Sequence, residues 1–94
     1  MTYIFKWDEE KNRLNILKHG ITFEEGATVF DDKKAIYLPD DTHSIDEERF
    51  IVIGFSDRAK LLLVCHCYQD DDSIIRIISV RKTTKREELE YEQQ

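Results

Sequence analysis

Long apolar runs, leader segments, proline and glycine are scarce or absent in this sequence. No apolar run approaches the roughly 20 residues that a membrane-spanning helix needs. The N-terminal segment lacks the basic start, the apolar stretch and the small-residue cleavage site of a signal peptide. One proline and three glycines leave no linker rich in these residues. We therefore expect a single domain over residues 1–94, with no membrane association.

Cysteine is almost as scarce, since the chain has only Cys65 and Cys67. A single residue separates them, which is too close for an ordinary disulfide within a strand. His66 between them suggests zinc, but alternation along a strand would send His66 to the other face. A closed zinc site also needs four ligands, and no second Cys/His pair has the right spacing. We interpret the three as packing residues, expect no metal, and place the protein in the cytosol.

Charge is abundant but unevenly distributed. The whole chain carries −6, whereas residues 73–86 contain five basic residues and no acidic one, so the remainder carries −11. A chain divided in this way can hold a phosphate at one place and repel nucleic acid elsewhere. A hydrophobic content of 40% and an aromatic content of 11% indicate a globular domain with one core.

The N-terminal third predicts a short strand followed by a helix. Residues 3–6 alternate weakly between apolar and polar, as a short strand does. Asp8 is a suitable N-cap for a helix that continues to about Lys18. Gly20 directly after it is a plausible left-handed C-cap.

A second, shorter helix is predicted next. Thr22 and Glu25 have the spacing of a capping box. Phe23, Ala27 and Phe30 recur at i, i+4 and i+7, which defines a stripe that should face the core.

The rest of the chain predicts strands and one final helix. Four strands are expected, over residues 35–38, 49–55, 60–68 and 73–80, and the short connections make the last three an antiparallel meander. A second capping box, Thr84 to Glu87, opens a C-terminal helix. The order is β-α-α-β-β-β-β-α. This predicts an α+β fold, with two N-terminal helices and a C-terminal helix packed on a mainly antiparallel sheet.

Lys18, His19 and Gly20 form the first candidate functional cluster. One interpretation is a helix end, where cations favour the negative end of the helix dipole and glycine caps it. The other places Lys18 and His19 beside a phosphate, with a histidine that titrates near neutral pH. Both can hold at once.

The strand over residues 73–80 carries the second cluster. Strict alternation puts Arg76 and Arg81 on opposite faces unless a bulge intervenes. An arginine among isoleucines is costly to bury without a partner. Arg76 must therefore meet a carboxylate, with Glu48 or Asp46 as candidates, or line a cleft where its planar guanidinium can bind a scissile phosphate.

The third cluster surrounds the start of the C-terminal helix and comprises Arg81, Lys82, Lys85 and Arg86. Free N–H groups at a helix N-terminus attract anions, and four cations would reinforce a phosphate site there. The alternative is a solvated charged surface. In the loop before residue 49, Asp40, Asp41, Asp46 and Glu47 flank His43, but no EF-hand pattern is present and a solvated loop is the stronger interpretation.

Taken together in order, these motifs resemble one known family. The segments that carry the resemblance are Phe5-x-Trp7-Asp8, Asn15-x-x-Lys18-His19-Gly20-Ile21-x-Phe23-Glu24-Glu25, Val29-Phe30-x-Asp32, Glu48-Arg49-Phe50-x-x-Ile53-Gly54-x-Ser56, Leu62-Leu63-Val64, Arg76-Ile77-Ile78-Ser79-x-Arg81-Lys82 and Glu88-x-x-Tyr91. This set is similar to the BrnT family of bacterial toxins and spans nearly the whole chain. Two departures are Val80, where the family often has alanine, and the doublet of Cys65 and Cys67.

The resemblance implies a RelE-like fold and a metal-independent endoribonuclease that inhibits translation and needs no cofactor. It also implies neutralisation by a BrnA-type antitoxin, a DNA-binding protein, so that operator DNA would be contacted only through the antitoxin.

RNA cleavage by attack of the ribose 2′-OH needs a base, an acid and cations that stabilise charge on phosphorus. On the matching positions, we expect His19, Arg76 and Arg81 to be catalytic. Lys18, Lys82, Lys85 and Arg86 would bind substrate, and Glu48 and Arg49 would support the site. Two alternatives stay open: a binding module that acts by occupying RNA or a partner, and an interaction protein whose acidic surface meets a basic partner.

Overall fold

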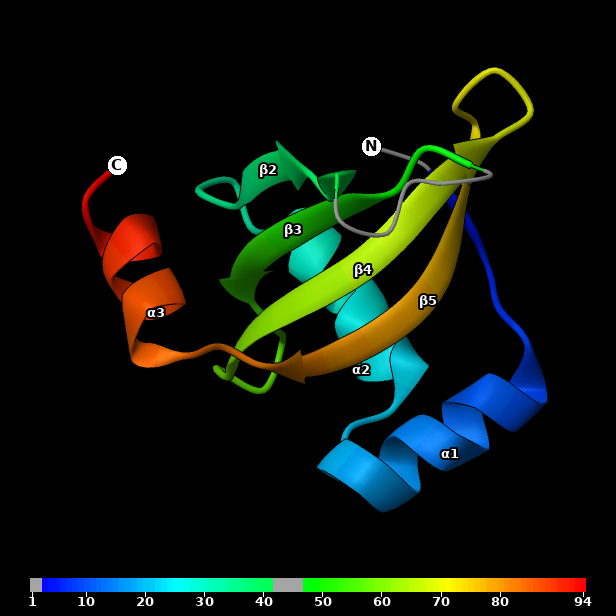
Figure 1. Cartoon of the computed structure of the whole chain (residues 1–94), viewed down its shortest axis with the longest axis horizontal. Coiled ribbons are helices and arrows are strands. Elements are labelled where there is room, and N and C mark those ends of the chain that lie inside the picture. Colours follow the sequence, from blue (N-terminus) through cyan, green and yellow to red (C-terminus); the bar gives the residue numbers. More distant parts are fainter. Residues whose placement is uncertain (1–2, 42–46) are drawn as a thin grey trace.

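The computed structural model describes residues 3–41 and 47–94. The elements within these ranges are, in order, β1 (Ile4–Lys6), α1 (Glu9–His19), α2 (Phe23–Thr28), the 3₁₀ turn η1 (Val29–Asp31), β2 (Ile36–Pro39), β3 (Phe50–Phe55), β4 (Leu61–Gln69), β5 (Ile74–Lys82) and α3 (Lys85–Glu92). They form the predicted α+β fold, in which helices pack on one mainly antiparallel sheet (Figure 1).

The sheet has the strand order β1-β5-β4-β3-β2. The predicted meander is confirmed, because β4 pairs antiparallel with both β3 and β5. At one edge β2 pairs antiparallel with β3. At the other edge β1 pairs parallel with the start of β5, so that Lys6 lies opposite Arg76. This parallel pairing joins the first strand of the chain to the last.

Capping residues set the helix boundaries as the sequence predicts. The Asp8 carboxylate accepts a hydrogen bond from the Glu10 amide at 2.8 Å, and Gly20 closes α1 with a left-handed φ of 71°. At α3 the capping box is complete, because the Thr84 hydroxyl accepts from the Glu87 amide and the Glu87 carboxylate accepts from the Thr84 amide.

The box predicted at Thr22 is only half formed. The Thr22 hydroxyl accepts from the Glu25 amide at 3.0 Å. The buried Glu25 carboxylate instead accepts a hydrogen bond from the Ser56 hydroxyl at 2.8 Å and lies 3.9 Å from the Lys60 ammonium. The side chain therefore ties α2 to the turn between β3 and β4.

The main core lies between the sheet and the layer formed by α2 and η1. The predicted stripe is confirmed, since Phe23 and Phe30 are buried and Ala27 packs against them. Gly26 permits this close approach, because a Cβ at this position would lie 2.5 Å from a methyl carbon of Val80. We call this side of the sheet the helix face.

The opposite side carries Leu63, Cys65 and Cys67 of β4, and we call it the open face. Helix α3 covers only one end of it, where Tyr91 packs with Ile53 and Leu63. In Figure 1 the open face is turned toward the viewer, with α2 behind the strands and α3 at the left. Neither α1, α2 nor α3, which all lie in the described ranges, is long and apolar enough to cross a membrane.

Candidate functional site

A β-bulge in β5 decides where its arginines point. Cys65 pairs with Ser79 but His66 pairs with Ile77, so that one additional residue, Ile78, is inserted into β5. The extra residue reverses the alternation beyond it. Strict alternation, which would put Arg76 and Arg81 on opposite faces, is therefore wrong for this strand. The alternative considered from the sequence, that a bulge intervenes, is confirmed.

Both arginines consequently lie on the open face. Arg76 pairs with Cys67 and Arg81 pairs with Leu63, two residues of β4 that point to this face. Val80 moves to the helix face, where it is buried. The structure thus places on one face two candidate residues that parity alone would separate, although their pairing partners lie four residues apart along β4.

A row of cations crosses the open face at the end remote from α3. Both Arg49, directly before β3, and Arg76 on β5 act electrostatically on Cys67, which lies on the strand between them. Lys6 follows on β1, exposed and in register with Arg76. We call Lys6, Arg49 and Arg76 the basic row.

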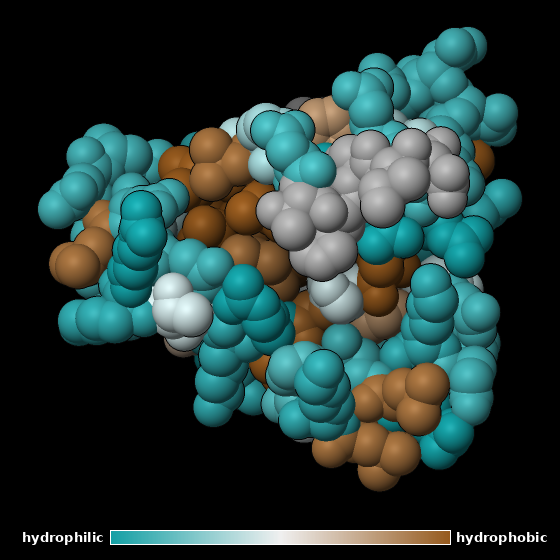
Figure 2. Space-filling view, viewed as in Figure 1, coloured by the Kyte–Doolittle hydropathy of each residue, from teal (hydrophilic) through white to brown (hydrophobic). Residues whose placement is uncertain are grey.

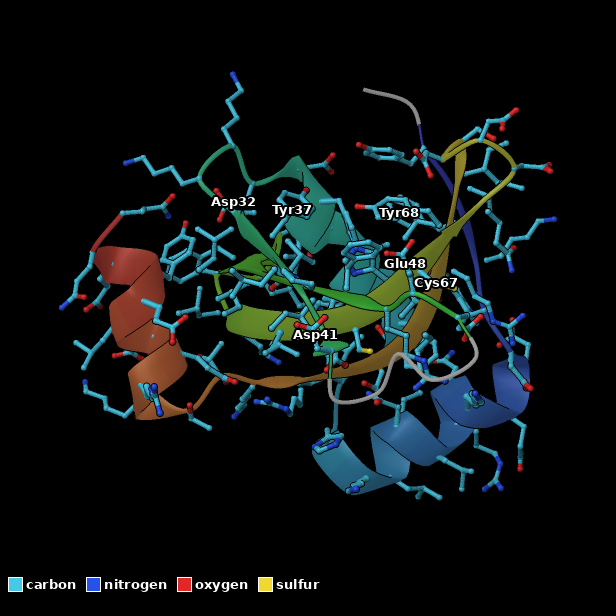
Figure 3. The ribbon with its side chains drawn as sticks, turned by 45° about the horizontal axis from the view of Figure 1, so that its top comes forward. Asp32, Tyr37, Asp41, Glu48, Cys67 and Tyr68 are labelled. Carbon is cyan, nitrogen blue, oxygen red and sulfur yellow. The ribbon has the colours of Figure 1, made fainter. Side chains whose placement is uncertain are left out.

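Arg76 is half-buried and has no carboxylate partner among residues 3–41 and 47–94. The salt bridge to Glu48 considered from the sequence does not form. The other candidate, Asp46, lies outside the described residues, as does His43. Glu48 itself is exposed and lines a depression with Cys67 and Tyr68, close to the basic row (Figure 3).

Arg49 is the better placed of the two supporting candidates. Its Nε lies 3.5 Å from a carboxylate oxygen of Glu47. Its carbonyl oxygen accepts a hydrogen bond from the Asp40 amide at 2.8 Å, which joins the segment after β2 to the start of β3.

Arg81 is held in a well-defined salt bridge. Its guanidinium donates two hydrogen bonds of 2.9 Å to the Glu87 carboxylate and a third, of 3.1 Å, to the Lys82 carbonyl. Hydrogen bonding to Arg81 lowers the pKa of Glu87 below its usual value. This side chain therefore attaches α3 to β5.

The remaining cations of the basic segment are dispersed. Lys82 is exposed and lies opposite the buried Leu62, so it belongs to the helix face. Lys85 lies 3.0 Å from Glu88, and Arg86 lies 4.0 Å from Glu90, within α3 itself. The segment is therefore less positive in the folded protein than its sequence indicates.

Lys18 and His19 end α1, which runs along the edge of β5. The contact is made by the buried Asn15, whose amide group donates to the Val80 carbonyl at 2.9 Å and accepts from the Val80 amide at 3.1 Å. Lys18 is exposed and His19 is half-buried. In the described part of the chain, no hydrogen bond or ion pair links either of them to Arg76 or Arg81.

The cysteines and His66 separate by face as the sequence predicts. Burial raises the pKa of Cys65 to about 11, and the nearby Asp40 carboxylate adds to this rise. Burial likewise raises the pKa of Cys67, with Glu47 adding to the effect and Arg76 opposing it. Both thiols are therefore protonated at neutral pH and poor nucleophiles.

His66 is fully buried on the helix face, with its ring edge-on to Phe30 at 4.8 Å. Burial lowers its pKa. Its Nδ1 lies 3.1 Å from the Val64 carbonyl and its Nε2 lies 3.3 Å from the Tyr68 hydroxyl. Within residues 3–41 and 47–94, no three His, Cys, Asp or Glu side chains gather in a way that could hold a metal ion.

Lys6 is the residue that the sequence did not reveal. It stands some 70 positions before Arg76, and only the parallel pairing of β1 with β5 brings the two together. The available signal was the short first strand, but nothing in its residues indicates which strand it pairs with.

Comparisons with known proteins agree with this architecture. Residues 7–87 match the model of a family described as "Ribonuclease toxin, BrnT, of type II toxin-antitoxin system". Among solved structures, the crystal structure of the Brucella abortus ribonuclease toxin BrnT is similar, with a TM-score of 0.66 and 23% sequence identity over 90% of this chain and 100% of that one. At this identity the likeness shows the fold alone. Comparison with curated proteins gave no match.

Proposed function

The chain belongs to the BrnT family of ribonuclease toxins of type II toxin–antitoxin systems, and on this premise we propose that it is an endoribonuclease that cleaves RNA on the open face without a metal ion. Cleavage would inhibit translation in the cytoplasm. A BrnA-type antitoxin would neutralise the protein, and operator DNA would be bound only through that antitoxin.

The observation that carries the proposal is the state of Arg76. A half-buried guanidinium with no carboxylate partner in the described ranges is costly unless it is used. A phosphodiester satisfies both its charge and its planar donor geometry. The basic row supplies Lys6 beside it, so that a second phosphate oxygen or a neighbouring phosphate can be bound, and Arg49 adds positive charge although it is paired with Glu47.

In the proposed reaction the ribose 2′-OH attacks the adjacent phosphorus, and the bond from phosphorus to the leaving 5′ oxygen breaks. Arg76 stabilises the additional negative charge on the phosphoryl oxygens. Arg81, oriented by Glu87, is the second proposed cation. His19 is the proposed general base, with Lys18 as a phosphate ligand approaching from the β5 edge. Lys82, Lys85 and Arg86 would contact flanking RNA, and Glu48 would support the site.

Cleavage of a mixed-sequence RNA by the purified protein in EDTA tests the proposal. We expect Arg76→Ala to lower the rate by about two to three orders of magnitude, which is typical when one donor that stabilises transition-state charge is removed. Arg13→Ala is the matched control, because its ion pair with Glu10 is exposed on α1. Activity that appears only with added divalent metal would contradict the metal-free reaction.

His19→Gln tests the proposed base separately. We expect a large fall in rate, because the amide of glutamine has the shape of the side chain's polar end but cannot accept the proton of the 2′-OH. If His19→Gln cleaves like the parent while Arg76→Ala does not, the base lies elsewhere and the phosphate site stands.

Occupancy without cleavage is the second candidate function. The pairing of Arg81, Lys85 and Arg86 with glutamates of α3 favours it, since it removes cations that catalysis could use. Growth arrest that survives substitution of Lys18, His19, Arg76 and Arg81, with cellular RNA intact, would establish this function in place of the nuclease.

A further inference from the structure

The open face contains a hollow beside the basic row, between β3, β4, β5 and α3. Its volume is about 260 Å³, which is enough for one heterocyclic base. Figure 2 shows apolar surface over the strands in this region, next to α3.

The floor of the hollow is apolar, whereas charged side chains line its sides, namely Asp40, Arg49, Arg81 and Glu87. Ile51, Cys65 and Ile78 line it. Ile51 pairs with Cys65, and Cys65 pairs with Ser79, so these two apolar side chains lie side by side across the sheet, with the inserted Ile78 next to Ser79. Because the Cys65 thiol stays protonated at neutral pH, the floor formed by Ile51, Cys65 and Ile78 offers an uncharged surface to a flat, neutral group.

Charged groups lie on both sides of the floor of the hollow. The basic row lies toward one end of the strands, and the Arg81–Glu87 pair lies toward the other. Along β4, Cys65 at the floor is two residues from Cys67, which pairs with Arg76 of the basic row, and two residues from Leu63, which pairs with Arg81. Two residues of a strand span about 6.6 Å. A nucleotide matches this spacing, since its base and its phosphate are held apart by the ribose.

Polar groups at the edge of the hollow are placed to read a base. Asp40 and Ser79 both line it, and the Cys65 thiol at its floor donates a 3.6 Å hydrogen bond to one oxygen of the Asp40 carboxylate, whose further acceptor positions can serve a base. A carboxylate accepts hydrogen bonds only. Guanine is the base whose pairing edge presents two adjacent donors, its imino and amino groups. Single-stranded RNA exposes this edge to proteins.

We propose that this hollow binds a guanine base of single-stranded RNA, with Ile51, Cys65 and Ile78 against its face and Asp40 accepting hydrogen bonds from its edge. The base selects the cleavage site, and the phosphate next to it reaches Arg76. The inference rests on the proposed nuclease function but concerns a separate property, the choice of base.

Cleavage-site mapping on a mixed-sequence RNA tests the choice of base. We expect guanine at one fixed position relative to the cut, and at least a tenfold loss of that preference in Asp40→Asn. Asp41→Asn is the matched control, because Asp41 is the neighbouring carboxylate and is not among the residues that line the hollow. Cleavage by the wild-type protein with no preference among the four bases would overturn the proposal and leave the nuclease function intact.

A second measurement does not depend on cleavage. GMP, AMP, CMP and UMP are added at millimolar concentration to the isotope-labelled protein, and NMR shifts of Ile51, Cys65 and Ser79 are recorded. We expect GMP to shift these resonances most, and Asp40→Asn to abolish the difference between nucleotides. Equal shifts for all four nucleotides, or shifts for none, would overturn the assignment. Selective GMP shifts in a protein that cleaves no RNA would uphold the base site and refute the nuclease.

Discussion

Asn15 shows how much one polar side chain contributes to the placement of α1. The helix exposes its larger apolar residues, with Leu17 72% exposed and Leu14 51% exposed. Asn15 is buried and bonds the main chain of Val80 twice and the carbonyl of Ile21 once. On the side of β5 away from β4, β1 pairs only with Ile74–Arg76, so that no strand of the described residues lies beside Val80 there. An asparagine thus provides the hydrogen bonds that a further strand would have made.

Asn15→Ala should therefore destabilise the protein by about 2–4 kcal/mol, because buried amide and carbonyl groups lose their partners. Leu17→Ala, an exposed change on the same helix, should stay within about 0.5 kcal/mol. Urea unfolding followed by the fluorescence of Trp7 measures both. Equal effects of the two substitutions would show that α1 is held by its apolar surface instead.

At the site itself, residue types were predictable from the sequence but their arrangement was not. Arg76 could be singled out because a cation amid isoleucines needs a partner or a ligand, and Arg81 because it lies in the cationic segment before the last helix, whereas Arg49 was indicated only by the family resemblance. That Arg81 is neutralised by Glu87 depends on how α3 docks, and that Arg76 lies near Lys6 depends on a parallel pairing 70 residues apart in sequence. Both relations are tertiary, and neither has a local signal.

At the scale of elements, local chemistry predicted the boundaries well and the faces less well. Caps at Asp8, Gly20 and Thr84 set the ends of α1 and the start of α3, because each satisfies main-chain groups within a few residues. The meander followed from short connections. The bulge at Ile78 did not, because a run of isoleucines gives no indication of which residue is inserted, and one insertion reverses every later side chain.

Helix α3 is attached by two carboxylates from different parts of the chain. Glu87 binds Arg81, and the Tyr91 hydroxyl donates a 2.6 Å hydrogen bond to Asp32. Burial tends to raise the pKa of Asp32, but hydrogen bonds from Tyr91 and from the amides of Phe55 and Lys34 outweigh it and leave the pKa lowered. Burial and the bond to Asp32 raise the pKa of Tyr91 to about 12.

This attachment should weaken in acid. A carboxylate whose pKa is lower in the folded state stabilises the fold above its unfolded pKa, about 4.5 for Glu87, and this stabilisation is lost as the pH falls through the folded value. Because the Arg81–Glu87 pair is partly exposed, its share is about 0.5–1 kcal/mol. Unfolding measured at pH 6 and pH 3.5 should therefore show a smaller drop in Glu87→Gln than in the parent.

Glu90→Gln is the control for this comparison, since its 4.0 Å ion pair with Arg86 is largely exposed on the same helix. It should retain the pH dependence of the parent protein. Identical pH dependence in the parent and in Glu87→Gln would mean that the salt bridge contributes nothing to the docking of α3.

At the scale of the whole molecule, a chain of net charge −6 presents a small cationic surface. Most cations of residues 73–86 are paired with glutamates of α3, and the basic row draws on three separate strands or their ends. Long-range attraction to RNA is therefore weak. Binding depends on contacts of a few ångströms, which are shorter than the screening length of about 8–10 Å and are therefore little screened by salt. The net charge of −11 on the rest of the chain suits a basic protein partner such as an antitoxin.

Salt dependence of RNA binding tests this charge distribution. If Lys6 and Arg76 each neutralise one phosphate while Arg49 stays paired with Glu47, the logarithm of the binding constant should fall against the logarithm of salt concentration with a slope of about −1.4, from about −0.7 per contact on single strands. Arg76→Ala should reduce the slope by about 0.7. Lys85→Ala should leave it nearly unchanged, because Glu88 already neutralises that lysine at 3.0 Å. A slope near −4 that responds equally to both substitutions would mean that α3 and the basic row bind RNA together, and that the internal salt bridges open when RNA arrives.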